Sequence, residues 1–148
     1  MIVRDGLRFN CCESVLLAVD ERHVLPGFDS GILKAASNLG GGVAGVGGVC
    51  GALIGGAMAI GLVYGTSGEE SPQRFDEVRL RERKMTQGLI ADFEARWGDV
   101  DCMTLLGCVG CTPDERAKRG EELKARGESH CDEYVDWVTE RVQGLLGR

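Results

Sequence analysis

The first third of the chain sets apolar residues at helical spacing between polar and glycine-rich breaks. Asn10, followed three residues later by Glu13, is typical of a capping box and predicts a helix that begins beside it. The residues that this helix would bury are Val15, Leu16 and Val19. A second short helix is expected from Asp29 to Ala36, ended by Asn38 and a run of glycines. No apolar-polar alternation with a period of two is long enough to predict a strand.

The segment 43–64 contains no charged residue and, as a helix, would be long enough to cross a bilayer. It is poor in Leu, Ile and Phe, however, and lacks a flanking cluster of Lys or Arg. We therefore favour a buried central helix over 50–63, after a loop over 40–48, rather than insertion into a membrane. Gly51, Gly55 and Ala59 would allow neighbouring helices to approach this helix closely.

The second half reads as longer amphipathic helices joined by polar segments. A linker over 66–73 precedes a long helix whose apolar stripe consists of Phe75, Val78, Met85, Leu89, Phe93 and Trp97. The last helix is expected to start near Ser129 and to close the core. Its apolar face consists of Tyr134, Val135, Val138, Val142, Leu145 and Leu146.

Between these two helices the segment 112–128 is strongly polar. Thr112-Pro113 with Glu115 indicates a helix start, but the residues that follow are nearly all charged. We expect a solvated, mobile excursion from the core. The whole pattern predicts an all-α fold, a single domain over 1–148 that forms a compact bundle of about five or six helices around the glycine-rich central helix.

Composition narrows the classes of function. With 148 residues and 43% hydrophobic content, the chain fits one domain with a real core. A net charge of −6 gives no broad positive field, so we expect no nucleic-acid partner. Residues 1–10 show no apolar run typical of a secretion signal, which favours a cytoplasmic protein. Because the cytosol keeps thiols reduced, the seven cysteines point to metal binding or redox chemistry.

Three cysteines lie at expected helix starts, where unpaired amides and partial positive charge lower the pKa of a thiol. They are Cys11 after Asn10, Cys102 after two aspartates, and Cys131 after Ser129. A thiolate binds metals and attacks disulfides. The alternative is that cysteines such as Cys11, Cys12 and Cys131 are small buried hydrophobic residues, since free cysteine is often fully buried.

Cys108 and Cys111 form a Cys-x-x-Cys pair, a spacing found in redox pairs and in half of many zinc sites. Thr112 stands where covalent attachment of a c-type haem would need a histidine, which argues against haem. A structural zinc site would combine this pair with Cys102 and Cys131. His23 and His130 are isolated, and we assign neither to a site.

Taken together, blocks along nearly the whole chain resemble the C_GCAxxG_C_C family of redox-type proteins, named for its cysteine pattern. The blocks are Asn10-Cys11 with Glu13-Ser14-Val15, Asn38-Leu39-Gly40-Gly41-Gly42, Val49-Cys50-Gly51-Ala52, Gly61-Leu62-Val63-Tyr64-Gly65, Cys102 with Leu105-Leu106-Gly107-Cys108, and Cys131 with Tyr134-Val135. The resemblance implies an all-helical protein whose cysteines meet near the glycine-rich helix.

On this resemblance, Cys11, Cys50, Cys102 and Cys108 fall on the family positions and are the expected metal ligands. Cys131, Cys111 and Cys12 are further redox or ligand candidates, and Gly51, Ala52 and Gly55 leave room beside Cys50. We expect an iron-sulfur cluster that transfers electrons to an unidentified redox partner protein, with zinc as the alternative metal.

Two other functions stay open from the sequence. In a metal-free thiol-disulfide protein, Cys11 or Cys102 would attack an oxidised partner and a neighbouring cysteine would resolve the mixed disulfide. In a structural or membrane-associated helical module, the cysteines would simply be buried. A glycine-faced central helix is also compatible with a homodimer, in which a second copy would complete the core or the cluster.

Overall fold

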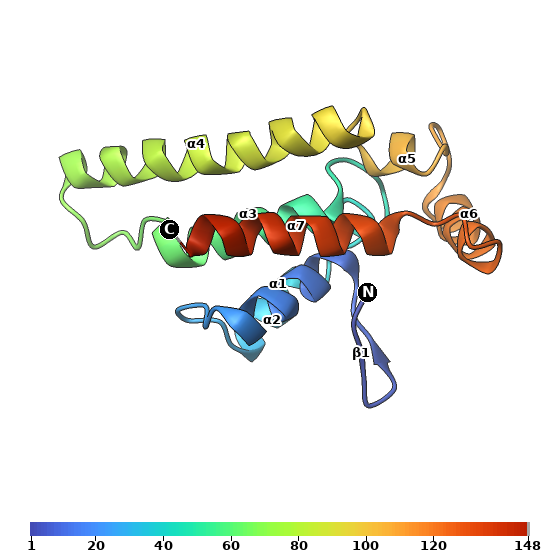
Figure 1. The fold of residues 1–148 in the computed structure, drawn as a ribbon, viewed down its shortest axis with the longest axis horizontal. Helices are drawn as coiled ribbons and strands as arrows, with labels where there is room; N and C mark the ends of the chain where they lie inside the picture. The colour runs from blue at the N-terminus through green and yellow to red at the C-terminus, as the bar shows by residue number, and fades with distance from the viewer. Residues whose placement is uncertain (148) are drawn as a thin grey trace.

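In a computed structural model, which describes residues 1–147, the chain folds into seven α-helices and one small hairpin (Figure 1). The helices are α1 (Cys11–Arg22), α2 (Ser30–Ala36), α3 (Gly51–Tyr64), α4 (Pro72–Trp97), α5 (Cys102–Leu105), α6 (Pro113–Ala125) and α7 (Cys131–Leu146). In the hairpin, β1 (Val3–Arg4) pairs antiparallel with β2 (Leu7–Arg8). The all-α prediction is confirmed, and the helix count rises because α5 and α6 both form.

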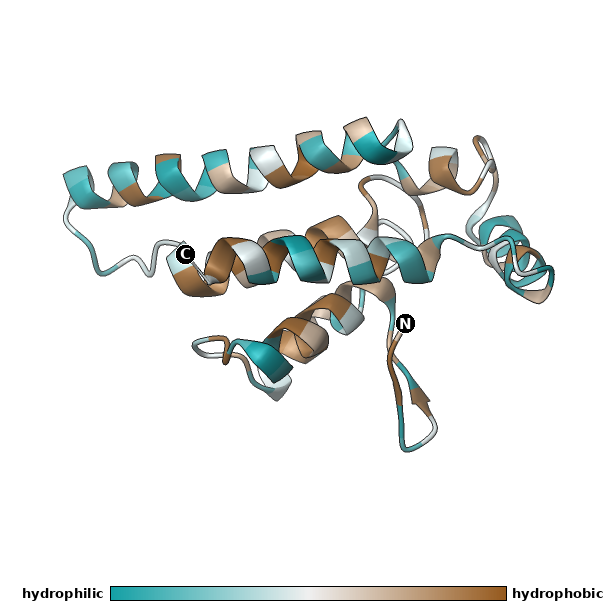
Figure 2. Ribbon diagram, in the orientation of Figure 1, coloured by the Kyte–Doolittle hydropathy of each residue, from teal (hydrophilic) through white to brown (hydrophobic). Residues whose placement is uncertain are grey.

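Helix α3 is the centre of the fold, packed against α1, α4 and α7. Its glycines permit this contact. A Cβ atom at Gly55 would lie 2.6 Å from the carbonyl oxygen of Cys12 in α1. At Gly56 it would lie 2.7 Å from Cγ1 of Val138 in α7. The expected close approach around the central helix is therefore present, and Figure 2 shows α3 as predominantly apolar.

Helix α4 crosses the top of Figure 1 and packs on α3 and α7. Leu89 and Phe93 are its buried residues, and the Phe93 ring packs edge-on against Tyr134 and Trp137 of α7. The predicted stripe thus reaches the core only in its C-terminal half. Phe75 and Val78, nearer the start of α4, are half-buried.

Capping residues begin the helices where the sequence predicts. In α1 the Asn10 side chain accepts from the Glu13 N–H while the Glu13 carboxylate accepts from the Asn10 N–H, the reciprocal pair of a capping box. Thr112 and Glu115 form a second such box at α6. The predicted helix start is present, and the polar segment forms a regular helix none of whose residues is buried. The solvated part of that expectation holds.

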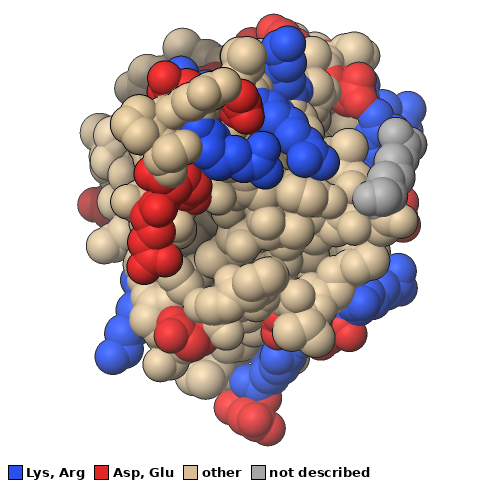
Figure 3. All heavy atoms as spheres, turned by 90° about the vertical axis from the view of Figure 1, so that its left-hand side faces the viewer, with Lys and Arg blue, Asp and Glu red and all other residues tan. Residues whose placement is uncertain are grey.

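The length and apolar character of the helices test whether any of them could cross a membrane. Among the helices of residues 1–147, none combines the length and apolar character needed to cross a bilayer, α3 included. Figure 3 views the end of the molecule away from α5 and α6, and acidic and basic groups are interspersed around that face. Neither acidic nor basic residues form an extended patch on that face.

Candidate redox site

Four unpaired cysteines line one cavity of about 510 Å³ at the end of the bundle where α1, α3, α5 and α7 begin. They are Cys11, Cys50, Cys102 and Cys131. Cys11, Cys102 and Cys131 are the first residues of their helices, and Cys50 is the N-cap of α3. Residues far apart in the sequence therefore present four sulfurs to one space.

Cys11 is held beside α3 by the glycine that follows Cys50. A Cβ atom at Gly51 would overlap Sγ of Cys11, so only glycine leaves room for this thiol. Asn10 fixes the start of α1, because its Nδ2 donates to the carbonyls of Ala36 and Ser37 at 3.3 and 3.0 Å. The first turn of α1 is thus tied to the end of α2 and to the glycine-rich loop.

Cys50 and Cys102 are brought together by a short antiparallel bridge between Val49 and Asp101. The Cys50 N–H donates to the carbonyl of Val100, and the Cys102 N–H donates to the carbonyl of Gly48, both at 2.7 Å. The Asp101 carboxylate then accepts from the Thr104 N–H and caps α5. The start of α5 is therefore fixed against the start of α3.

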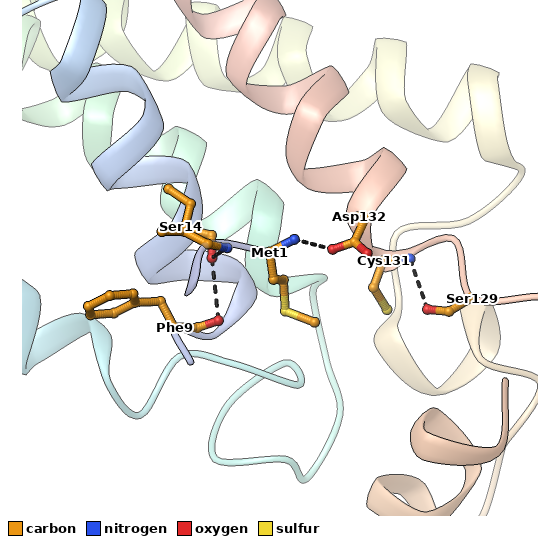
Figure 4. Close-up of polar contacts among 7 residues, drawn as sticks. Met1, Phe9, Ser14, Ser129, Cys131 and Asp132 are labelled. Atoms are coloured by element: carbon orange, nitrogen blue, oxygen red, sulfur yellow. Dashed lines mark hydrogen bonds and ion pairs between the residues drawn. The ribbon is translucent and has the colours of Figure 1, made fainter. Parts of the chain in front are cut away.

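Cys131 lies at the start of α7, where its N–H donates to Oγ of Ser129 (Figure 4). The terminal amino group of Met1 pairs with the carboxylate of the next residue, Asp132 (Figure 4). Both Met1 and Cys131 line the cavity. The N-terminal segment is thereby held along the edge of the site, with Ile2 N–H donating to Ser14 Oγ at 3.0 Å.

Arg116 and Tyr134 also line the cavity, although the sequence did not assign them to the site. Arg116 of α6 donates from Nε to the carbonyl of Gly45 at 3.1 Å, and its Nη1 lies 3.9 Å from Sγ of Cys102. Tyr134, predicted as a core residue, lines the same cavity. Arg116 carried no recognisable signal, since it lies in a run of charged residues whose contacts depend on how α6 folds back.

Burial dominates the titration of these thiols. It raises the pKa of Cys50 to about 12, although the N–H groups of Ala52 and Leu53 favour the thiolate. It raises the pKa of Cys102 to about 11, opposed by the Arg116 guanidinium. Burial also raises the pKa of Cys131 above its ordinary value. The prediction of lowered pKa values is therefore wrong for Cys102 and Cys131, because desolvation outweighs the helix N-terminus.

The same electrostatics show that the groups face one another. Burial, together with the thiols of Cys131, Cys50 and Cys102, raises the pKa of Tyr134 to about 12. The phenol of Tyr134 therefore lies near these thiols at the cavity.

The other three cysteines lie outside this cavity. Cys108 is bonded to Cys111, so this predicted ligand does not join the other three, and Cys131 lines the cavity with them instead. The bond also departs from the expectation of reduced thiols throughout. Cys12 is fully buried in the core, its Sγ 3.7 Å from Sδ of Met58.

The four cysteines line one cavity. Within residues 1–147, no three His, Cys, Asp or Glu side chains are close enough to hold a single metal ion. The donor set is nevertheless the one that iron-sulfur clusters use, four cysteines on rigid helix starts. A group of several atoms could be held by sulfurs that stand further apart than the ligands of one ion, so the residues present fit such a group in number and type.

These features define a class, a small helical protein with a four-thiol cavity at the helix starts. The chain belongs to the family described as "Putative redox-active protein (C_GCAxxG_C_C)", whose model matches residues 9–145. That name has one cysteine before a glycine motif, one in it and two after; this chain has Cys11 and Cys12 before the motif, Cys50 in it, and Cys102, Cys108, Cys111 and Cys131 after it. The name writes Gly before Cys, whereas this chain has Cys50 before Gly51. No curated protein and no solved structure matches the chain significantly.

Proposed function

We propose that this protein transfers electrons through an iron-sulfur cluster bound by the thiolates of Cys11, Cys50, Cys102 and Cys131. The observation that carries the proposal is that four unpaired thiols from four helix starts line one cavity. Cysteine thiolates are the usual ligands of such clusters, which exchange single electrons. The partner would be a redox protein that reaches the open side of the cavity.

The protonation of two of the thiols argues against metal-free thiol chemistry at this site. With pKa values near 12 and 11, Cys50 and Cys102 stay protonated at neutral pH and are poor nucleophiles. A bound metal displaces those protons, because it competes directly for the thiolate. Burial that inhibits attack on a disulfide therefore does not prevent ligation.

The surroundings would tune a bound cluster. Amide N–H groups at the helix starts, the guanidinium of Arg116 and the phenol of Tyr134 all lie at the cavity. Hydrogen bonds and positive charge beside the sulfurs favour the reduced, more negative state of a cluster, and burial excludes water from it. These residues hold and orient the sulfurs and supply the local field.

A mononuclear zinc site is less well supported. Structural zinc needs four ligands around one ion at about 2.0–2.3 Å. No such group of three or more ligands is present in residues 1–147.

The test is anaerobic purification followed by a visible spectrum and by measurement of iron, zinc and acid-labile sulfide per chain. Wild-type protein should be brown and hold iron and sulfide. Cys131→Ser should lose most of both, whereas Cys108→Ser, which removes the ligand expected from the sequence, should keep them. Colourless wild-type protein that gains no iron and sulfide on chemical reconstitution would rule the cluster out, and zinc without sulfide would replace it with a zinc site.

A further inference from the structure

A second sulfur pair lies outside the four-thiol cavity, in the loop between α5 and α6. Cys108 and Cys111 are bonded to each other across the dipeptide Val109-Gly110, with their Cα atoms 5.4 Å apart. A hollow beside the bond is lined by residues of α6, among them Glu115, Lys118, Arg119 and Glu122. The four-thiol cavity does not include either sulfur.

A backbone turn also holds the two cysteines together, in addition to the bond. The Cys111 N–H donates to the carbonyl of Cys108 at 3.0 Å, and Gly110 has a φ of 81°. This is a β-turn whose third residue needs positive φ, which glycine adopts without strain. The Cys108 N–H also donates to the carbonyl of Met103 at 2.8 Å. The turn can therefore persist when the disulfide opens, which suits a bond that is made and broken.

The two sulfurs differ in access. Cys108 is 5% exposed and packs with Cys102, Met103 and Leu106, whereas Cys111 is half-buried at the edge of that cluster. Cys111 also directly precedes Thr112, the N-cap of the 13-residue helix α6. Helix N-termini stabilise a thiolate. Cys111 is therefore the sulfur that an incoming molecule meets, and Cys108 lies behind it.

The charged residues beside the pair include both signs. Arg119 donates from Nε to the carbonyl of Leu106 at 3.3 Å, so its guanidinium lies over the loop that holds Cys108. Lys118 adds a second positive charge, and Glu115 and Glu122 line the other parts of the hollow. Val109, between the cysteines, is 77% exposed. An exposed apolar tip with mixed charges around it suits a polypeptide surface rather than a small buried ligand.

We infer that Cys108 and Cys111 form a second redox site, a dithiol-disulfide pair that reduces disulfide bonds of partner proteins, with Cys111 as the nucleophile and Cys108 as the resolving cysteine. This activity goes beyond the proposed electron transfer and needs no metal.

The chemistry balances as a two-electron exchange. In the reduced pair the Cys111 thiolate attacks one sulfur of the partner disulfide, forming a mixed disulfide and releasing one partner thiolate. The Cys108 thiolate then attacks Sγ of Cys111, which forms the bond seen in the structure and releases the second partner thiolate. The two protons lost by the pair end on the partner thiols. A dithiol reductant regenerates the reduced pair.

The test uses insulin as the protein disulfide and dithiothreitol as the reductant, with precipitation of the insulin B chain as readout. Wild-type protein should accelerate precipitation several-fold over dithiothreitol alone, and Val109→Ala, which keeps both cysteines and their spacing, should do the same. Cys111→Ser should abolish the acceleration. Cys108→Ser, reduced and then freed of reductant, should accumulate a mixed disulfide with insulin at Cys111, located by peptide mass spectrometry.

A rate for Cys111→Ser equal to wild type, or a mixed disulfide formed at another cysteine, would overturn the inference. A measurement without substitutions guards against misfolded variants. Wild-type protein equilibrated in graded mixtures of reduced and oxidised dithiothreitol, then alkylated, should pass between bonded and free Cys108–Cys111 while its circular dichroism stays constant. A Cys108–Cys111 disulfide that never forms, or that opens only when the protein unfolds, would also overturn the inference.

Metal content measured on the same samples separates the two proposals. Protein that stays colourless after chemical reconstitution but has Cys111-dependent activity supports the exchange site and rejects the cluster. Brown protein whose insulin reduction is independent of Cys111 supports the cluster and rejects the exchange site.

Discussion

Gly51, the first residue of α3, lies directly against the thiol of Cys11, the first residue of α1, with no room for a side chain between them. A Cβ atom there would also come within 2.8 Å of the carbonyl oxygen of Leu39. We predict that Gly51→Ala displaces Cys11 from the cavity and lowers the iron bound per chain, because the sulfur and the loop carbonyl must both move.

Gly61 in the same helix is the matched control. A Cβ atom there would meet only Oε1 of Glu82, at 3.7 Å and at the end of a flexible side chain. Gly61→Ala should keep full metal content and raise the free energy of unfolding by about 0.5–1 kcal/mol, the usual gain for alanine inside a helix. Equal iron loading in the two variants would show that the contact of Gly51 with Cys11 does not position the site.

The helices could be predicted because their signals are local. The Asn10 and Thr112 capping boxes, and the apolar spacing around Val138, each lie within a few residues of the helix that they specify. The position of Cys102 in the site could not be predicted in this way, since it is fixed by a bridge between Val49 and Asp101, residues far apart in the chain. Only the resemblance to the family indicated that these cysteines meet.

The choice between Cys108 and Cys131 shows the same limit. Cys108 was expected as the fourth ligand because the resemblance to the family puts it, with Cys11, Cys50 and Cys102, on the family positions. Its place is decided instead by the glycine turn, which directs Cys108 to Cys111. Cys131 reaches the cavity because α7 begins beside α5, a matter of helix packing that no local pattern encodes.

Arg116 is predicted to control the reactivity of Cys102 in the metal-free protein. Its Nη1 lies 3.9 Å from Sγ of Cys102, and its charge lowers the pKa of that thiol against the effect of burial. Arg116→Gln should therefore raise the pKa further and slow alkylation of Cys102 by iodoacetamide at pH 9 several-fold. Peptide mass spectrometry gives the rate at this residue.

Arg119→Gln is the control for that experiment, because Arg119 bonds the carbonyl of Leu106 and not the thiol. It should leave the alkylation rate of Cys102 unchanged. If both variants slowed labelling alike, the effect would belong to the stability of α6 rather than to the charge of Arg116.

The metal-free protein should lose stability in alkaline solution. Burial raises the pKa of Cys12 to about 12 and that of Cys102 to about 11, from 9.0 for a free thiol. Above pH 9 the unfolded chain therefore binds fewer protons than the folded one, and the contribution of these thiols is lost as pH rises towards 11 and 12. Urea unfolding at pH 8 and pH 10.5 measures the change.

Replacing one buried thiol isolates its contribution to the loss of unfolding free energy at high pH. Cys12→Ala removes a group that titrates in the unfolded chain, so the fall in unfolding free energy between the two pH values should be smaller than in wild type. An identical fall in the two proteins would argue that Cys12 does not hold its proton in the folded state.

The aromatic contact between α4 and α7 should dominate the stability of the second half of the chain. Phe93 is fully buried and contacts the rings of Trp97, Tyr134 and Trp137. Phe93→Ala should lower the free energy of unfolding by about 3–5 kcal/mol, the usual cost of removing a buried phenylalanine. Phe75→Ala at the half-buried start of α4 should cost clearly less, and equal losses would contradict the observed packing.

The four cavity cysteines come from helix starts that are separated by most of the chain. In the unfolded polypeptide they are remote, so the site comes into being only as the bundle closes. A ligand bound there would link the starts of α1, α3, α5 and α7, and its binding free energy would add to the free energy of folding. Loss of metal would then loosen the whole bundle, so the redox state and the lifetime of the protein would be governed by the same four sulfurs.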